Sequence, residues 1–343
     1  MSTSLVLFMM ALVSLAMSTR LWLKLGWIGV RAVRPGGAAL ASWCLRHLCP
    51  NGRGFLPAAL VLRGYAAADR GDTQSAVADA DRALEIAHGA SPDLCRWYFV
   101  NAAIDIYVNA GRYGRALAAA ERWTAEAQAR GVAQHPRLHA YAAINRAEAL
   151  HNVGEHQAAL RLLDETEHQA TPRDRLSREG LELLRAWILS HVGRAPEAWT
   201  RLASIAPRTF GPRYRAEYHF TRALALCETG ELEAAEREAR AGTGVARRAA
   251  SRRNALHVEA RVAMAAQDDA RVIALLERAR RHGYQGQAAP VLVHLGQAYE
   301  RAGNPAEARR AYQDALAADP ESFACGAANA RLAVLADDLS PSV

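Results

Sequence analysis

Apolar side chains in residues 290–320 recur at the spacing of two consecutive helices. Leu292, Leu295 and Tyr299 stand at positions i, i+3 and i+7, which places them on one face of a helix. Gly303 interrupts this pattern, and a second apolar stripe with a helical period follows it. The segment therefore predicts two short helices that fold back on each other.

The second of these helices has clear start signals. Asn304 stands at the capping position, Pro305 at the first helical position, and Glu307 at the place that completes a capping box with Asn304. The side chains expected on its inner face are Ala308, Tyr312 and Ala315. Gly296 on the first helix is also small, so we expect the two helices to cross at close range.

The same arrangement recurs upstream at intervals of 36 to 43 residues. The turn positions are Gly71, Gly111, Gly154, Gly193, Gly230, Gln267 and Gly303. Five residues after them stand Ala76, Ala116, Ala159, Ala198, Ala235, Val272 and Ala308. Twelve residues before each of these stand Gly64, Ile104, Ala147, Ala186, Ala223, Ala260 and Gly296. Each column is small in six of the seven units, which predicts seven closely packed hairpins.

Residues 290–320 resemble the tetratricopeptide repeat (TPR), a helical hairpin of about 34 residues. The positions that match the family are Leu292, Leu295, Gly296, Tyr299, Ala308, Tyr312, Ala315 and Pro320. Through the repeated turn positions the resemblance covers residues 57–320. It implies an all-α protein, a TPR-like α-solenoid of about seven hairpins over residues 57–336. Residues 323–336 would form a capping helix, and residues 337–343 a tail.

The first 30 residues predict a single transmembrane helix that anchors the protein. Residues 1–19 carry no charged side chain and would span roughly 28 Å as a helix, about one hydrocarbon core. Arg20 and Lys24 follow, interleaved with Trp22 and Trp27, as is typical of the interface at the end of a span. Two alternatives stay open, a cleaved signal peptide and a helix lying in the interface. Residues 31–56 read as a basic linker that contains a further amphipathic helix.

The net charge of +7 comes entirely from this N-terminal part of the chain. Seven basic residues precede the first acidic one, Asp69, and the remaining 35 basic and 35 acidic residues balance. This distribution argues against nucleic-acid binding and places the basic residues beside the predicted span. Because such residues stay on the cytoplasmic side, we expect an inner-membrane, single-pass protein with cytoplasmic repeats. Signal-peptide cleavage would instead make it periplasmic.

The cysteines predict free thiols rather than a disulfide framework, because their number is odd and their spacing irregular. They are Cys44, Cys49, Cys95, Cys227 and Cys325. Two groups have some metal-ligand character, namely His47 between the first two cysteines, and the pair His135 and His139. The first lacks the spacing of a zinc site and the second crosses Pro136, so we predict no metal.

No motif for catalysis or nucleotide binding is present, which predicts a protein that is not an enzyme and has no cofactor. In the TPR family the first helix of each hairpin lines a concave groove for peptides or partner helices. The resemblance places these residues there: Asn101, Asp105, Asn109, Tyr141, Glu148, His151, Asn152, Trp187, His191, Glu217, Phe220, Glu228, His257, Arg261, Gln297, Glu300 and Arg301. For each of them the alternative is packing against a neighbouring hairpin. The groove would be acidic and aromatic near its middle, which suits a basic or amphipathic segment.

The resulting functional hypothesis is a membrane-anchored TPR scaffold or adaptor. It would bind protein segments during assembly of an envelope or secretion complex. One alternative is a regulator that senses a small peptide signal, and another is an enzyme whose site has no known motif. The expected partners are a protein or peptide and the membrane, with no nucleic acid and no small-molecule substrate.

Overall fold

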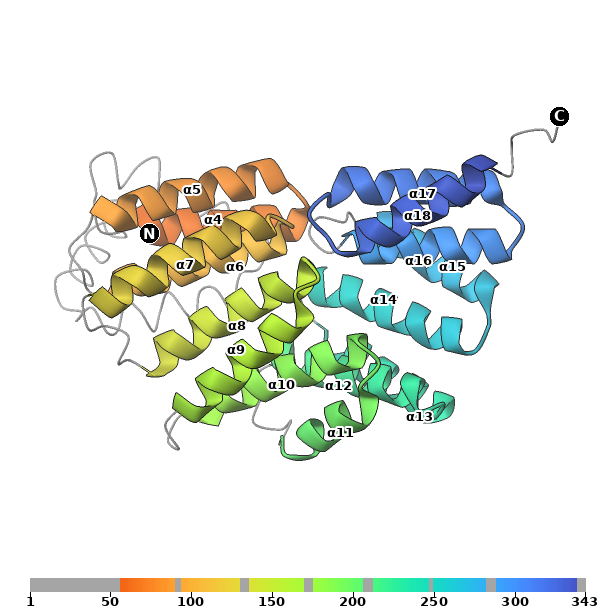
Figure 1. Cartoon of the computed structure of the whole chain (residues 1–343), viewed down its shortest axis with the longest axis horizontal. Helices are drawn as coiled ribbons and strands as arrows, with labels where there is room; N and C mark the ends of the chain where they lie inside the picture. The colour runs from red at the N-terminus through yellow and green to blue at the C-terminus, as the bar shows by residue number, and fades with distance from the viewer. Residues whose placement is uncertain are drawn as a thin grey trace, which may run out of the picture.

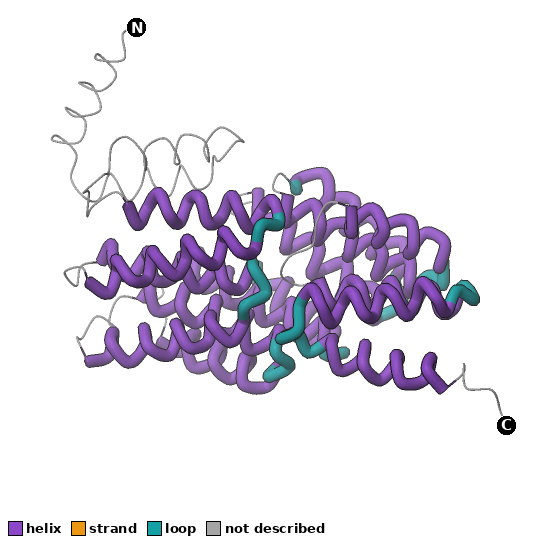
Figure 2. Tube along the Cα trace, turned by 90° about the horizontal axis from the view of Figure 1, so that it is seen from above, coloured by secondary structure: helices purple, strands orange, loops and turns teal. Residues whose placement is uncertain are grey.

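The computed structural model describes residues 56–89, 94–129, 136–169, 175–205, 212–246, 249–281 and 288–337. Within these ranges all regular structure is helical, and no strand occurs. Figure 2, coloured by secondary structure, shows these ranges as helices with short loops between them. The predicted anchor and most of the predicted linker lie outside the described residues. Among the helices described, none is both long and apolar enough to cross a bilayer.

Within the described ranges the helices pair in chain order as seven hairpins followed by one more helix (Figure 1), which confirms the predicted solenoid. The pairs are α4 (Leu56–Arg70) with α5 (Thr73–Gly89), α6 (Leu94–Asn109) with α7 (Tyr113–Ala129), α8 (Pro136–Asn152) with α9 (His156–Gln169), α10 (Arg175–His191) with α11 (Ala195–Ala203), α12 (Pro212–Glu228) with α13 (Leu232–Val245), α14 (Ala249–Ala265) with α15 (Asp269–Arg281), and α16 (Ala288–Arg301) with α17 (Pro305–Ala318). The last helix, α18 (Ala324–Asp337), packs on α16 and α17 as the predicted cap.

The predicted turn positions are the places where the backbone reverses. All six turn glycines have a positive φ, between 68° and 94°. Gln267 has φ 58° and is the only non-glycine residue with a positive φ among those described. Because a side chain is strained in this region, glycine is the natural residue there and Gln267 is the exception.

The predicted capping box is wrong, although α17 begins at Pro305 as expected. The side chain of Asn304 makes no capping hydrogen bond, and its backbone carbonyl accepts from the Ala308 amide at 3.0 Å. The same position is used differently in two other hairpins. Asp72 accepts from the Ser75 amide at 3.0 Å, and Asp268 caps α15 in the same way. Helix capping by this position therefore varies between units while the turn itself is constant.

The two columns of small residues form the contact line within each hairpin. All seven residues of the column that begins with Ala76 and ends with Ala308 are 0% exposed. The partner column is equally buried, and its glycines allow the closest approach. A Cβ added at Gly64 would stand 3.4 Å from Cβ of Asp79 and 3.5 Å from the carbonyl oxygen of Ala76, both on α5. Alanine and glycine thus let the paired helices pack backbone to backbone.

The superhelix turns far enough to close on itself. Helix α14 of the sixth hairpin contacts α4 of the first, and Figure 1 shows the first hairpins (orange and yellow) beside the last ones (blue). The turn between α17 and α18 reaches the turns of the second and third hairpins, where Tyr113 and Asn152 receive it. The first helices of the hairpins consequently enclose a common inner surface.

Candidate binding surface on the inner helices

Side chains from four hairpins meet on the inner side of the superhelix. We define the inner surface as His151, Trp187, His191, His257, Arg261 and His294. The rings of His151 and His191 have centroids 5.4 Å apart, although they lie on α8 and α10. His257 Nε2 and His294 Nδ1 are 3.0 Å apart, which joins α14 to α16. Arg261 and His257 on α14 also act electrostatically on His191 of α10, so helices far apart along the chain contribute to one surface.

The imidazoles of this surface are neutral at pH 7. Burial lowers the pKa of His191 to about 3, and Arg261 opposes its protonation further. Burial, again with Arg261 nearby, lowers the pKa of His294 to about 3. Burial also holds the pKa of His151 and His257 well below its usual value. A neutral imidazole has one donor and one acceptor nitrogen, so the His257–His294 contact is a hydrogen bond between unlike nitrogens.

Arg261 is the charge at the centre of the inner surface. Its guanidinium donates to Glu228 over 3.5 Å, at the limit of a hydrogen bond. Arg301, by comparison, pairs with Asp269 at 2.6 Å. Arg261 therefore keeps donor capacity for a ligand, because five N–H groups meet one distant carboxylate.

Trp187 supplies the largest apolar side chain of the inner surface. Its ring lies 4.4 Å from that of His191, whose Nδ1 is 2.9 Å from the carbonyl oxygen of Trp187 one turn earlier. Trp187 is partly exposed and packs in part against the core cluster of α12 to α14. An aromatic ring beside a cation is suited to an amphipathic ligand.

Most of the predicted groove residues retain solvent exposure. Those that are partly exposed are Asp105, Asn109, Tyr141, Glu148, Trp187, His191, Glu217, His257, Arg261, Gln297 and Glu300. Glu228 and Arg301 are exposed. The buried ones are Asn101, His151, Asn152 and Phe220. The predicted acidic character is weakened at the centre because Glu228 pairs with Arg261.

The assignment of Phe220 to the groove is wrong. Its side chain is 0% exposed and packs between α12 and α13. A Cβ added at Gly242 would stand 2.4 Å from Cε1 of Phe220, so the ring fills the space that the glycine leaves. Phe220 is a core residue of the fifth hairpin and cannot touch a partner.

Asn101 and Asn152 are also removed from the accessible surface, by packing against neighbouring elements. The Asn101 carbonyl accepts from Nδ2 of Asn145 at 3.1 Å, which links α6 to α8. The Asn152 carbonyl accepts from the Phe323 amide at 2.9 Å, across 171 residues of sequence. For these two residues the alternative given by the sequence analysis applies, namely packing against another part of the solenoid.

Sequence reasoning missed two histidines that the fold brings to this region. His294 lies one position after the expected column and bonds to His257. His156, at the start of α9, has Nδ1 3.0 Å from Nδ1 of His151. No shared register position marks them, because His294 lies in the middle of a first helix and His156 begins a second helix.

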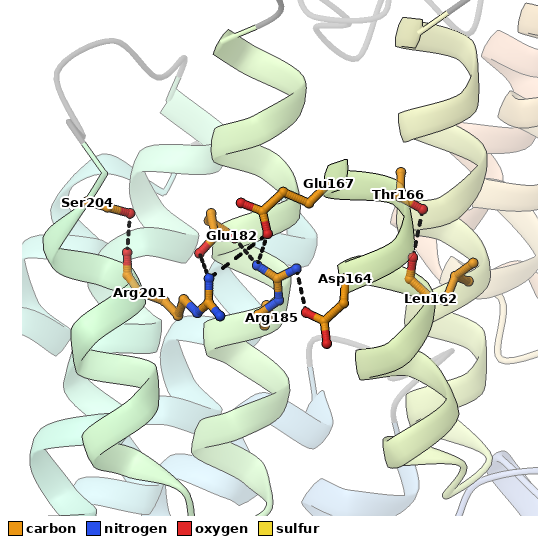
Figure 3. A network of polar contacts seen from close by, with 8 residues as sticks. All are labelled: Leu162, Asp164, Thr166, Glu167, Glu182, Arg185, Arg201 and Ser204. Carbon is orange, nitrogen blue, oxygen red and sulfur yellow. Dashed lines mark hydrogen bonds and ion pairs between the residues drawn. The ribbon is translucent and has the colours of Figure 1, made fainter. Parts of the chain in front are cut away.

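A second polar cluster, shown in Figure 3, is structural. Arg185 on α10 is buried, and its guanidinium pairs with Asp164 and Glu167 at 2.9 Å each and with Glu182. Arg201 on α11 approaches Glu182 at 3.5 Å. Because these carboxylates already neutralise Arg185, the cluster joins α9, α10 and α11 rather than offering a charge to a ligand.

The described residues contain no group of three or more His, Cys, Asp or Glu arranged to hold a metal ion. The groups Cys44–His47–Cys49 and His135 lie outside them. Cys227 and Cys325 are free thiols, as predicted. Burial raises the pKa of the Cys227 thiol to about 11 and also raises that of Cys325, so neither is an activated nucleophile.

Comparison with known proteins identifies a repeat in the last hairpin. A family model described as Tetratricopeptide repeat matches residues 289–322. No curated protein matches the sequence. The chain thus contains a tetratricopeptide repeat in α16 and α17, where the resemblance in the sequence is strongest.

Three solved structures are similar to the whole solenoid. A Rap protein complexed with Competence and Sporulation Factor has a TM-score of 0.64 at 12% identity, over 93% of this chain and 89% of that chain. The APC/C hetero-tetramer Cut9–Hcn1 has a TM-score of 0.57 at 13% identity, and the match covers 89% of this chain and 53% of that chain. A tetratricopeptide repeat protein from Parabacteroides merdae ATCC 43184 has a TM-score of 0.50 at 14% identity, and the match covers 82% of this chain and 100% of that chain. At these identities the similarity establishes the TPR-like fold.

Proposed function

We propose that this TPR-like solenoid is a scaffold that binds a short amphipathic protein segment on its inner surface. The observation that carries the proposal is the convergence of Trp187, Arg261 and the neutral histidines from α8, α10, α14 and α16. Trp187 would hold an apolar side chain, and Arg261 would receive a carboxylate. Such a site would bind and position a partner.

The closed superhelix favours a short segment over a long partner helix. Helix α14 touches α4, and the turn after α17 reaches the second and third hairpins, so the inner helices face one another around a restricted surface. This supports the second candidate function, a regulator that senses a small peptide. The similar Rap protein is complexed with Competence and Sporulation Factor, which is in keeping with that candidate.

We propose further that residues 1–30 anchor the protein in the inner membrane, with the repeats on the cytoplasmic side. The support is the uncharged apolar run followed by Arg20 and Lys24. In that position the scaffold would gather protein segments for an envelope or secretion complex. Cleavage of the same residues as a signal peptide would place the repeats in the periplasm.

Binding is tested with a matched pair of tryptophan variants of the full chain. A partner is cross-linked in detergent extracts and identified, and its segment is then titrated as a synthetic peptide. Trp187→Ala should weaken binding at least tenfold with unchanged unfolding, whereas Trp199→Ala should not weaken it. Trp199 is 41% exposed on α11, where Arg222 lies 5.0 Å from its ring. Equal affinity of the two variants, or unfolding of Trp187→Ala, would refute the site.

Topology needs a reporter cysteine, because Cys227 and Cys325 have raised pKa values and react slowly wherever they are. Ala274 is exposed on α15 and suits an Ala274→Cys variant. An impermeant thiol reagent should label it only after lysis if the repeats are cytoplasmic. Labelling of intact spheroplasts, or a mature N-terminus near Thr19, would establish the periplasmic alternative.

A further inference from the structure

The turn between α17 and α18 makes three separate contacts with hairpins that precede it by more than 150 residues. We call residues 319–323 the latch. The Tyr113 hydroxyl donates to Oδ2 of Asp319 at 3.3 Å. The Gly114 amide donates to Oε2 of Glu321 at 2.6 Å. The Phe323 amide donates to the Asn152 carbonyl at 2.9 Å. Each contact uses a different residue of the latch, so the whole turn is engaged.

The receiving residues form a site with defined chemistry. Gly114 is the second residue of α7, where backbone amides lack partners within the helix and attract a carboxylate. The Phe323 ring lies with its centroid 5.2 Å from that of His156, edge to face, and 5.8 Å from that of His151. The site therefore accepts an acidic residue followed two positions later by an aromatic one.

Gly154 leaves the room that the aromatic residue needs. A Cβ at this position would lie 3.2 Å from Cβ of Phe323, which is tighter than ordinary van der Waals contact. The glycine thus serves the turn of the third hairpin through its φ of 94° and also admits the latch.

The latch holds its shape through its own hydrogen bonds. The Asp319 carbonyl accepts from the Ser322 amide at 3.1 Å and from Sγ of Cys325 at 3.1 Å. Asp319 and Ser322 are 0% and 4% exposed, whereas Glu321 is exposed and Phe323 keeps 39% of its surface exposed. Because Phe323 is the single large apolar side chain of this turn and stays partly exposed, the turn can leave its site without unfolding the hairpins on either side.

From these contacts we infer that the turns of the second and third hairpins are a docking site for an acidic–aromatic segment, which residues 319–323 occupy in cis as a reversible latch. The latch holds the superhelix closed. It also covers His151, whose ring lies 5.4 Å from that of His191 on the inner surface. A partner segment that carries Glu-x-Phe would displace the latch and gain access to that surface. The inference does not depend on which ligand the inner surface binds.

Hydrogen exchange of the full chain in detergent tests the inference, because Gly114 and Phe323 donate their amides across the contact. The latch variant is Glu321→Gln/Phe323→Ala. The matched control is Glu307→Gln/Val334→Ala, which changes an exposed carboxylate on α17 and a side chain that is 44% exposed on α18. Residues 113–115 and 322–324 should exchange at least tenfold faster in the latch variant, with α10 to α15 unchanged. The control should match the wild-type protein.

A synthetic peptide of residues 317–326 then tests whether the site binds such a segment in trans. At millimolar concentration it should restore protection of residues 113–115 in the latch variant, and the peptide with both substitutions should not. Unchanged exchange in the latch variant, faster exchange through all hairpins, or equal effects of the two peptides would each overturn the inference. Circular dichroism of every variant confirms that the comparison is between folded proteins.

Discussion

The ring of Tyr312 lies directly against the backbone of Gly296, where an added Cβ would stand 2.5 Å from the ring atom Cε1. The two residues join α16 to α17, and the Tyr312 ring is completely buried. The last hairpin therefore depends on a glycine in the middle of a helix, in spite of its low helix propensity.

Gly296→Ala should destabilise the protein by about 1–3 kcal/mol, because the methyl group forces the Tyr312 ring out of its position. Denaturant unfolding measures the change. Gly326→Ala on α18 is the control, since a Cβ there meets nothing within 4 Å. The control should raise stability by about 0.5–1 kcal/mol through helix propensity. If both variants shift stability in the same direction, the proposed packing of Gly296 is wrong.

Removal of the buried guanidinium of Arg185 should be costly. Arg185→Ala leaves Glu182, which is 8% exposed, without its main partner, and we expect a loss of about 3 kcal/mol. Arg82→Ala is the control, because Arg82 and Glu85 form an exposed pair with 61% and 63% of their side chains accessible. That change should cost at most about 0.5 kcal/mol. Urea unfolding measures both losses, and a loss for Arg185→Ala no larger than that for Arg82→Ala would show that the cluster is dispensable for stability.

The histidines of the inner surface should make stability depend on pH between 6.5 and 5. His191 and His294 have pKa values of about 3 in the folded protein, below the ordinary value of 6.5 in the unfolded chain. The unfolded state thus binds protons first, so stability is complete above pH 6.5 and falls as the pH drops below it. Each histidine contributes at most about 1.4 kcal/mol per pH unit, and less where solvent reaches the ring.

The double variant His191→Gln/His294→Gln should flatten this pH dependence. Urea unfolding at pH 7, 6 and 5 gives the free energy of unfolding for both proteins. Carboxylates whose pKa is lowered, such as Glu236 beside Arg271, lose their contribution only at still lower pH. A slope in the variant equal to that of the wild-type protein would show that these two rings are already protonated or exposed.

Gln267 should be the turn position where a substitution improves stability. Its φ of 58° strains a residue with a side chain, and Gln267→Gly should stabilise the protein by up to about 1 kcal/mol. Gly230→Ala provides the opposite case. Gly230 has a φ of 80°, and a Cβ added there would meet no atom within 4 Å. Only backbone strain therefore acts in this variant, and the free energy of unfolding should fall by about 1 kcal/mol. Thermal unfolding of the pair isolates the backbone effect.

The fold could be predicted because each hairpin is specified locally. A turn residue and two small residues at fixed distances define one unit, as in Gly303, Ala308 and Gly296, and the turn positions all have the expected backbone. The exception, Gln267, adopts the same conformation despite its side chain. Local spacing could not show that α14 meets α4, because that contact depends on small rotations summed over six hairpins.

The candidate site was harder to predict for the same physical reason. The register shows which face of each first helix is inward, but not which distant hairpins meet there, so His156 and His294 were missed. Phe220 illustrates a different error. Gly242 stands in the second-helix column where the last unit has Ala315, and that missing side chain is the signal that Phe220 turns into the hairpin. Pairing each large residue with its opposite small one would have found it.

The latch also has a consequence for the order in which the chain folds. Neighbouring hairpins close loops of about 40 residues, whereas the Tyr113–Asp319 contact closes one of 206. For a flexible chain the longer closure costs about 1.5 kcal/mol more in entropy. Folded hairpins remove that cost, because the superhelix that they form already places Tyr113 and Asp319 close together. We therefore expect ring closure to be the final step of folding, so that its formation would report that all the intervening hairpins have formed.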